Sequence, residues 1–370
     1  MTKRNANFEL LRIVAMVMIL CLHYNAYCDT LLDLGTEASS VQIFATIIEA
    51  FCITGMNTYV FISGYFLSDS KIRPSRIFQL ICQVYFYTIL ISLAMMIAGT
   101  YVVRPNDSVY KIVQYIFPIS SEHYWFVTAY VIMYIFAPVM NAAVRQLSRK
   151  QLKAIIIALL IWFCFIKSFV PVMFVTDHAG YDFGWLMVVY LVAAYIRKYD
   201  VKVFYNARNS ALVFLFSCVM IAAMSIGLYY INLVRGGFAY YSEVPFHHNF
   251  FFTLTGSLGL FSFFRYMKVK ENKAADVIRF VAPFTFGVYL LHMHIEMKDR
   301  WVEWIEHVIG EAPTESVPLY ALHLAASVVI IFAAGVFVDW IRKMIFDYVG
   351  RVLRDTWLFK KIRQWDEELC

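Results

Sequence analysis

Charged residues are scarce in this sequence. Asp, Glu, Lys and Arg make up 16% of the 370 residues, whereas 61% are hydrophobic and the mean hydropathy is +0.63. A soluble domain of this size could not bury so much apolar surface. The composition therefore excludes a soluble globular protein and predicts an all-α, polytopic integral membrane protein.

The sequence also lacks the cysteine spacings of common metal sites. It has seven cysteines, no Cys-x-x-Cys pair, and most of the cysteines fall inside apolar runs. This pattern excludes the usual zinc motifs and offers no disulfide framework. We interpret the cysteines as small apolar packing residues and expect no bound metal.

Ten apolar runs are candidates for membrane spans. They cover residues 8–28, 41–67, 77–103, 124–140, 154–175, 183–196, 210–231, 247–264, 277–294 and 318–341. The sixth run is short and the eighth begins with polar residues, so counts of nine or eleven stay open. The sequence shows no internal repeat, no low-complexity segment and no soluble domain.

Basic residues alternate between the loops that connect these runs. The two chain ends and loops 68–76, 141–153, 197–209 and 265–276 hold 24 Lys and Arg residues, and the intervening loops hold five. The excess of basic residues predicts that both termini and this set of loops are cytoplasmic. Because topology explains the net charge of +6, we do not expect nucleic acid as a partner.

The chain divides into two expected parts. Residues 1–341 form a membrane domain, and residues 342–370 form a basic tail in which Trp357, Leu358 and Trp365 alternate with Lys and Arg. Such a tail is typical of an amphipathic helix on the inner leaflet. The sequence carries no signal for the oligomeric state.

Arg12 and His23 are ionisable residues inside the first apolar run. Such residues are expensive in a membrane and are functional candidates. Their spacing of eleven residues returns to nearly the same helix face after a rise of about 16 Å. One helix face would thus hold a cation near one membrane surface and an imidazole near the other. The alternative is that Arg12 extends to lipid phosphates and His23 is an interface residue.

Further polar residues lie at the same two depths. Ser63 lies in the second run, and Arg73 and Arg76 follow it on the cytoplasmic side. On the outer side, a polar and aromatic cluster opens the fourth run, and a histidine closes the ninth run. These residues are Glu122, His123, Tyr124, Trp125 and His292. Imidazole suits proton transfer near neutral pH, so their common depth indicates chemistry at the outer side.

Four segments carry a resemblance to a known family. They are ELLRIVAMVMILCLH (Glu9–His23), NTYVFISGYFL (Asn57–Leu67), HYWFVTAYVIMYIFAP (His123–Pro138) and FGVYLLH (Phe286–His292). In this order they resemble the helix patterns of the family-3 membrane acyltransferases. These are ten-span enzymes that O-acylate cell-surface polysaccharides and related glycans.

The resemblance implies transfer of an acyl group, usually acetyl, from cytoplasmic acetyl-CoA to a glycan hydroxyl at the outer face of the cell membrane. It implies that His23 is the catalytic imidazole, either as general base or as acyl carrier. Donor binding would involve Arg12 and Ser63, since guanidinium groups bind phosphates through paired hydrogen bonds. Arg73 and Arg76 are further candidates for the CoA phosphates, but the positive-inside rule explains their presence equally well. Acceptor binding would involve Glu122, His123, Tyr124, Trp125 and His292. Tyr124 and Trp125 could equally pack at the membrane interface, and His123 and His292 are competing candidates for the catalytic imidazole.

A transporter or flippase for a lipid-linked glycan is the alternative function. Some relatives work beside polysaccharide export machinery, which supports this alternative. Proteins of polysaccharide synthesis or export would then be partners of this chain. A transporter should line a site at the middle of the membrane, built by interrupted helices from two related halves. The sequence has no matched pair of Gly/Pro-interrupted runs, and its polar residues collect near the two surfaces. The pattern therefore favours the enzyme, although it does not specify the acceptor glycan or the acyl group.

Overall fold

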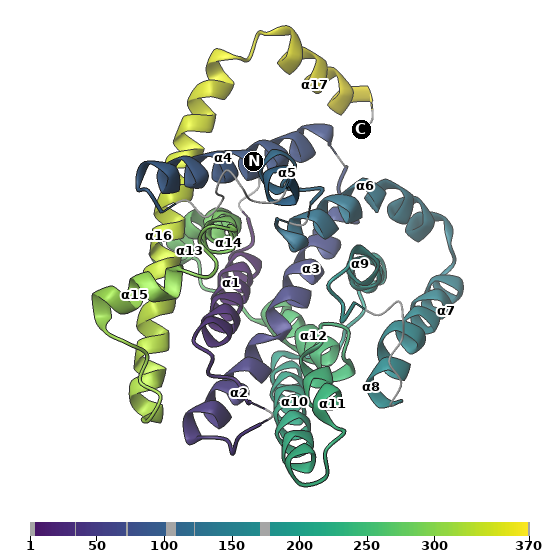
Figure 1. The fold of residues 1–370 in the computed structure, drawn as a ribbon. Helices are drawn as coiled ribbons and strands as arrows, with labels where there is room; N and C mark the ends of the chain where they lie inside the picture. Colours follow the sequence, from purple (N-terminus) through teal and green to yellow (C-terminus); the bar gives the residue numbers. More distant parts are fainter. Residues whose placement is uncertain are drawn as a thin grey trace.

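The computed structural model describes residues 4–33, 35–71, 73–100, 109–121, 123–170 and 178–368 (Figure 1). These residues form helices and connecting loops, and none of them belongs to a β-strand. The all-α prediction is therefore confirmed.

The helices follow one another along the chain with short connections. The first half contains α1 (Ala6–Tyr27), α2 (Ser40–Cys52), α3 (Thr54–Leu67), α4 (Pro74–Ile97), α5 (Val109–Ile116), α6 (Trp125–Gln146), α7 (Arg149–Leu160), the π-helical segment η1 (Ile161–Ile166), α8 (Lys167–Phe169) and α9 (Phe183–Tyr199). The second half contains α10 (Ala207–Arg235), α11 (Ala239–Glu243), η2 (Val244–Phe246), α12 (Phe251–Tyr266), α13 (Lys273–Val281), η3 (Ala282–Phe284), α14 (Thr285–His292), α15 (Trp301–Ile309), α16 (Val317–Val352) and α17 (Trp357–Glu368).

Each of the ten apolar runs overlaps a helix or helices that directly follow one another, and the ends of runs 77–103 and 154–175 lie outside the described residues. Within the described ranges, eight of these helical segments are long and apolar enough to cross a membrane. The other two expected spans are α9 and α12, which have 17 and 16 residues. The protein is thus an all-α, multi-pass membrane protein.

Local sequence sets several helix ends. Ser39 and Gln42 form a reciprocal capping box at the start of α2. Pro74 occupies the first turn of α4, where no backbone N–H is needed. The expected second span is interrupted at Ile53, which separates α2 from α3. A hydroxyl-to-carbonyl hydrogen bond of 2.9 Å from Thr54 to Phe51 spans this break.

A buried carboxylate joins α4, α14 and α16. Asp339 on α16 accepts hydrogen bonds from Gln83 Nε2 at 2.9 Å and from Tyr87 OH at 3.0 Å, and it pairs with Arg342 at 2.8 Å. A Cβ added to Gly287 would lie 2.3 Å from Asp339 Cγ, so only glycine allows α14 to approach this closely. The cluster fixes the position of α14.

The two ends of the chain lie on the same side of the bundle. Arg279 Nε donates to the Arg4 carbonyl at 2.7 Å, and the backbone N–H of Ser75 donates to Asp366 at 2.9 Å. Figure 1 accordingly draws the N-terminus and α17 in the upper part of the view. We call this end, formed by the start of α1, the α3–α4 loop and α17, the terminal face. The opposite face contains the end of α1, the start of α6 and the end of α14.

The tail continues from the bundle without a break. The expected domain boundary at residue 341 falls within α16, which runs to Val352, and α17 follows after a short loop. Trp357 is 76% exposed, and α17 also contains the basic residues Lys360, Lys361 and Arg363. The separate role of this tail at the inner leaflet stays a prediction.

Candidate active site

Two imidazoles from distant parts of the chain meet where α1 packs near α14. His23 Nδ1 lies 2.8 Å from His292 Nε2. His292 is completely buried, whereas His23 is partly exposed and lines a cavity. The sequence predicts a common depth for the two imidazoles, and the structure shows that they form a hydrogen-bonded pair.

The hydrogen-bond network assigns the protons of this pair. His292 Nδ1 lies 2.7 Å from the Val288 carbonyl, which can only accept, so His292 Nδ1 carries a hydrogen. In the neutral ring His292 Nε2 is then an acceptor, and His23 Nδ1 must donate to it. His23 Nε2 consequently has a free lone pair. The pair therefore leaves one basic nitrogen, on the ring that lines the cavity.

This cavity has a volume of about 150 Å³, and we call it the imidazole cavity. Residues from α1, α2, α3, α6 and α14 and from the loop before α12 form its wall. Besides His23, its polar and aromatic lining residues are Glu49, Tyr59, Trp125, Phe126, Tyr181, His248, Phe286 and Tyr289. An apolar wall with a few converging polar groups is typical of a small-molecule site.

Three rings in mutual contact form one side of the imidazole cavity. Tyr181 lies 4.5 Å from His248 and 4.7 Å from Trp125, measured between ring centroids. The rings of Trp125 and His248 are nearly parallel at 6.0 Å. Such an aromatic wall offers flat apolar surfaces beside polar ring atoms.

The sequence analysis did not identify Glu49 or His248. Glu49 is buried on α2 and accepts a hydrogen bond of 3.1 Å from Asn25 Nδ2. Its signal in the sequence is a carboxylate inside the apolar run 41–67, which is itself a functional indication. His248 lies at the polar start of the eighth run, and only the fold shows that it lies beside Trp125.

Two predicted acceptor-binding residues hold the backbone at the opposite face. His123 Nδ1 donates to a backbone carbonyl of α5 at 3.1 Å, and Nε2 accepts the Ile295 backbone N–H at 3.2 Å. Burial lowers the pKa of His123 to about 4, so its ring is neutral at pH 7. The Tyr124 hydroxyl donates to a carbonyl of α14 at 3.0 Å. Neither residue lines the imidazole cavity, and Glu122 lies outside the described residues.

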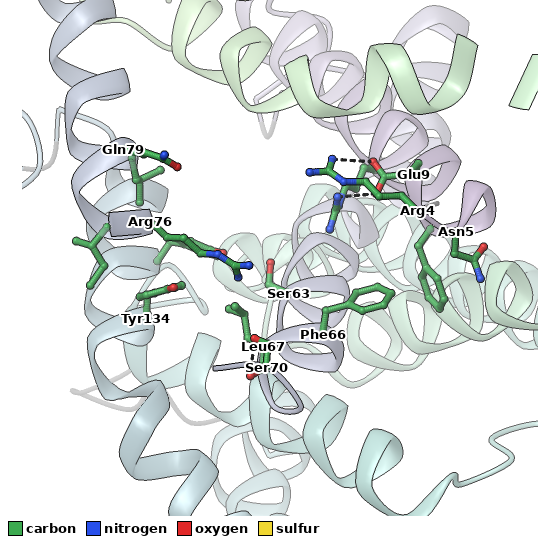
Figure 2. Close-up of a pocket in the computed structure, with 15 residues that line it drawn as sticks. Arg4, Asn5, Glu9, Ser63, Phe66, Leu67, Ser70, Arg76, Gln79 and Tyr134 are labelled. Carbon is green, nitrogen blue, oxygen red and sulfur yellow. Dashed lines mark hydrogen bonds and ion pairs between the residues drawn. The ribbon is translucent and has the colours of Figure 1, made fainter. Parts of the chain in front are cut away.

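A second cavity of about 630 Å³ opens at the terminal face, and we call it the arginine cavity. Three of the predicted donor-binding residues, Arg12, Ser63 and Arg76, line it, whereas Arg73 does not. Arg12 pairs with Glu9 at 2.9 Å and keeps 27% of its side chain exposed. Figure 2 shows Arg76 reaching from α4 toward Ser63, with Glu9 on the far side of the space.

Only one helical turn separates the two cavities. Three helices line both of them through residues four positions apart, which corresponds to a rise of about 6 Å. The pairs are Arg12 and Met16 on α1, Ser63 and Tyr59 on α3, and Tyr130 and Phe126 on α6. We call the single helical turn between the two cavities the partition. The Tyr59 hydroxyl forms a hydrogen bond of 2.7 Å with Thr285 Oγ1, which connects the partition to the start of α14.

The arrangement combines two kinds of chemistry. An uncharged imidazole with a free nitrogen can accept a proton or attack a carbonyl. Guanidinium groups beside a large cavity can bind phosphates. No group of three His, Cys, Asp or Glu side chains in the described ranges is arranged to hold a metal ion.

Comparison with known proteins gives the family. No curated protein and no solved structure matches the chain. The sequence profile of a family described as the acyltransferase domain, Acyl_transf_3, matches residues 5–336 and so covers the whole helical bundle up to the middle of α16. The match includes the cavity-lining residues named above, from Arg12 on α1 to Tyr289 on α14, and it also includes His292. The chain belongs to the family-3 membrane acyltransferases.

Proposed function

We propose that this acyltransferase moves an acetyl group from acetyl-CoA to a hydroxyl of a cell-surface or lipid-linked glycan. The donor occupies the arginine cavity, and the acceptor occupies the imidazole cavity. The observation that carries this proposal is the His23–His292 pair, which faces the imidazole cavity one helical turn from the arginine cavity. The basic loops make the terminal face cytoplasmic, so that acetyl-CoA enters from the cytoplasm. The protein would then act in the cell membrane.

Donor binding rests on the charge of the arginine cavity. Arg12 and Arg76 approach the space from α1 and α4, and Ser63 adds a hydroxyl from α3. These groups suit the phosphates of CoA, because guanidinium groups form strong charge-assisted hydrogen bonds with phosphate oxygens. The pantetheine arm is long and flexible, so the thioester can pass the partition while the phosphates stay on the arginines.

The reaction follows from the proton positions. His23 Nε2 accepts the proton of the acceptor hydroxyl as that oxygen attacks the thioester carbonyl. The new C–O bond forms, the C–S bond breaks, and the imidazolium returns its proton to the departing thiolate, which gives the ester and CoA. His292 accepts the His23 Nδ1–H throughout and stabilises the transient positive charge.

Acceptor binding rests on the wall of the imidazole cavity. The clustered rings of Trp125, Tyr181 and His248 offer flat apolar surfaces against which a sugar ring can stack. Glu49 supplies a hydrogen-bond acceptor for a sugar hydroxyl at the same wall. The aromatic side and the polar side together suit a carbohydrate better than a purely apolar lipid.

The test compares the surface glycans of cells with and without the protein by mass spectrometry. We expect the acetyl ester to be lost without the protein, and to be restored by the wild-type protein but not by His23→Ala. Glycan that carries identical esters in both strains would refute the proposal. Glycan that accumulates inside the cell with unchanged esters would instead support the transporter alternative.

A second measurement separates the general base from the acyl carrier. Purified protein in nanodiscs is mixed with radiolabelled acetyl-CoA in the absence of an acceptor. If His23 acts as a general base, the protein stays unlabelled after rapid denaturation at neutral pH, conditions under which an acyl-imidazole survives long enough to be detected. Label that is retained by the wild-type protein and lost in His23→Ala would show that the imidazole carries the acetyl group.

A further inference from the structure

A third cavity opens at the terminal face next to the arginine cavity. Its volume is about 820 Å³, and it lies between the ends of α3, α6 and α9 and the start of α4. Ser70, Ile77 and Tyr134 line both cavities, so the two spaces are direct neighbours. We call it the basic cavity because lysine and arginine side chains line it.

Four cationic side chains line the basic cavity, namely Lys71, Arg145, Arg197 and Lys198. Two of them already have partners. Arg197 pairs with Asp69 at 2.6 Å, and Lys198 Nζ donates to carbonyl groups at the end of α6, among them Leu147 O at 3.3 Å. Asp69 is the one acidic side chain in the lining.

Lys71 and Arg145 are different. Neither side chain forms a hydrogen bond or an ion pair with any of the residues that the structure describes. Both are exposed at the cavity, one from the loop after α3 and one from the last turn of α6. Two unpaired cations that face one large cavity from different elements are suited to an anionic ligand, and a guanidinium favours phosphate oxygens.

The geometry points to the basic cavity as the binding site for the 3′-phosphoadenosine end of acyl-CoA, with Lys71 and Arg145 as ligands of its 3′-phosphate, while the diphosphate stays at Arg12 and Arg76. This inference rests on the proposed function and deepens it. If the thioester approaches His23 through the arginine cavity, the nucleotide end must remain at the terminal face. The neighbouring cavity offers that end space, and it offers two positive charges, on Lys71 and Arg145, that none of the described residues pairs with.

The test uses a pair of ligands that differ in one phosphate. Purified protein in nanodiscs of neutral lipid is titrated with CoA and with 3′-dephospho-CoA, each competing against labelled acetyl-CoA. A charge-assisted hydrogen bond contributes enough that we expect the wild-type protein to prefer CoA by about 10- to 100-fold. Arg145→Ala and Lys71→Ala should reduce this preference severalfold and leave the affinity for 3′-dephospho-CoA nearly unchanged.

Arg149→Ala is the matched control. Arg149 lies four residues after Arg145 and carries the same charge, but its guanidinium lies over the Tyr199 ring and it does not line the basic cavity. This variant should keep the full preference for CoA. An equal loss in Arg149→Ala and Arg145→Ala would show a general effect of surface charge and would overturn the inference.

Two further outcomes separate the possible failures. If Arg145→Ala and Lys71→Ala both bind acetyl-CoA and still discriminate CoA from 3′-dephospho-CoA as the wild type does, the nucleotide site is elsewhere and the proposed function stands. If the wild-type protein binds neither acetyl-CoA nor CoA, the proposed function itself fails. The cavity could alternatively hold a phospholipid headgroup. Mass spectrometry that finds phosphatidylglycerol retained by the wild type and lost in Arg145→Ala, together with equal binding of the two CoA ligands, would establish that alternative and refute ours.

Discussion

The His23–His292 pair leads to an asymmetric prediction for glutamine substitutions. In the assigned network His292 only accepts a hydrogen bond from His23, and a glutamine carbonyl can also accept one. His23 must take up a proton, which glutamine cannot do. We therefore expect His292→Gln to keep much of the activity, whereas His23→Gln should lose about 10²–10⁴-fold, the usual contribution of a general base.

The variant His292→Phe measures how much the hydrogen bond between His23 and His292 contributes to the rate. His292→Phe fills the buried space but leaves the His23 Nδ1–H without an acceptor while the ring becomes positively charged. A hydrogen bond to a charged group contributes about 1.5–3 kcal/mol, which corresponds to about 10- to 150-fold in rate. His292→Phe should thus lie between His292→Gln and His23→Gln. The double variant with His23→Ala should be no slower than His23→Ala alone, because the two rings act as one unit.

The assay measures label transfer from acetyl-CoA to glycan at saturating donor, with equal amounts of each protein in nanodiscs. Thermal melting of the same samples shows whether each variant is folded. His123→Gln serves as a comparison, since His123 does not line the imidazole cavity. Full activity of folded His292→Phe would refute the role of His292. Equal losses in His292→Gln and His292→Phe would show that His292 acts through its own proton and not as an acceptor.

Three further predictions test the donor side, the packing and the orientation. Arg12→Lys should raise the KM for acetyl-CoA at nearly constant kcat, since it keeps the charge and loses the paired donors; an unchanged KM would contradict this. Gly287→Ala should destabilise the protein by about 1–3 kcal/mol through its clash with Asp339, which a lowered Tm would show. Cysteines introduced at Glu37 and Lys150 should be labelled from opposite sides of the membrane, and labelling of both from the same side would refute the predicted orientation.

The helices were predictable from hydropathy, but their interruptions were not. The run 41–67 reads as one span, whereas the structure breaks it at Ile53 into α2 and α3. Hydropathy averages over many residues and does not register a single turn in a continuous apolar segment. The π-helical segment Ile161–Ile166 is invisible in the sequence for the same reason.

The site was predictable in part, because some of its geometry is local. Arg12 and His23 lie on one helix, so their spacing gives their relation directly. The contact between His23 and His292 depends on how α1 packs near α14, and Gly287 and Asp339 help to set the position of α14. Nothing in the spacing of the chain encodes that contact. For His292, the sequence predicted only the depth in the membrane and not the contact with His23.

The polar network behind Glu49 explains how an apolar bundle can hold the imidazole cavity open to a polar acceptor. Asn25 donates to Glu49 and accepts from the Tyr320 hydroxyl at 2.8 Å, which in turn lies 2.7 Å from Thr30 Oγ1. These bonds join α1, α2 and α16 and satisfy groups whose burial would otherwise be costly. A bonded network of this kind resists rearrangement, so under the proposed function the acceptor side would be organised before the substrate arrives. Arg12 is held by Glu9 within its own helix and stays partly exposed, so on the donor side the guanidinium can reorient toward a phosphate without disturbing the helix packing.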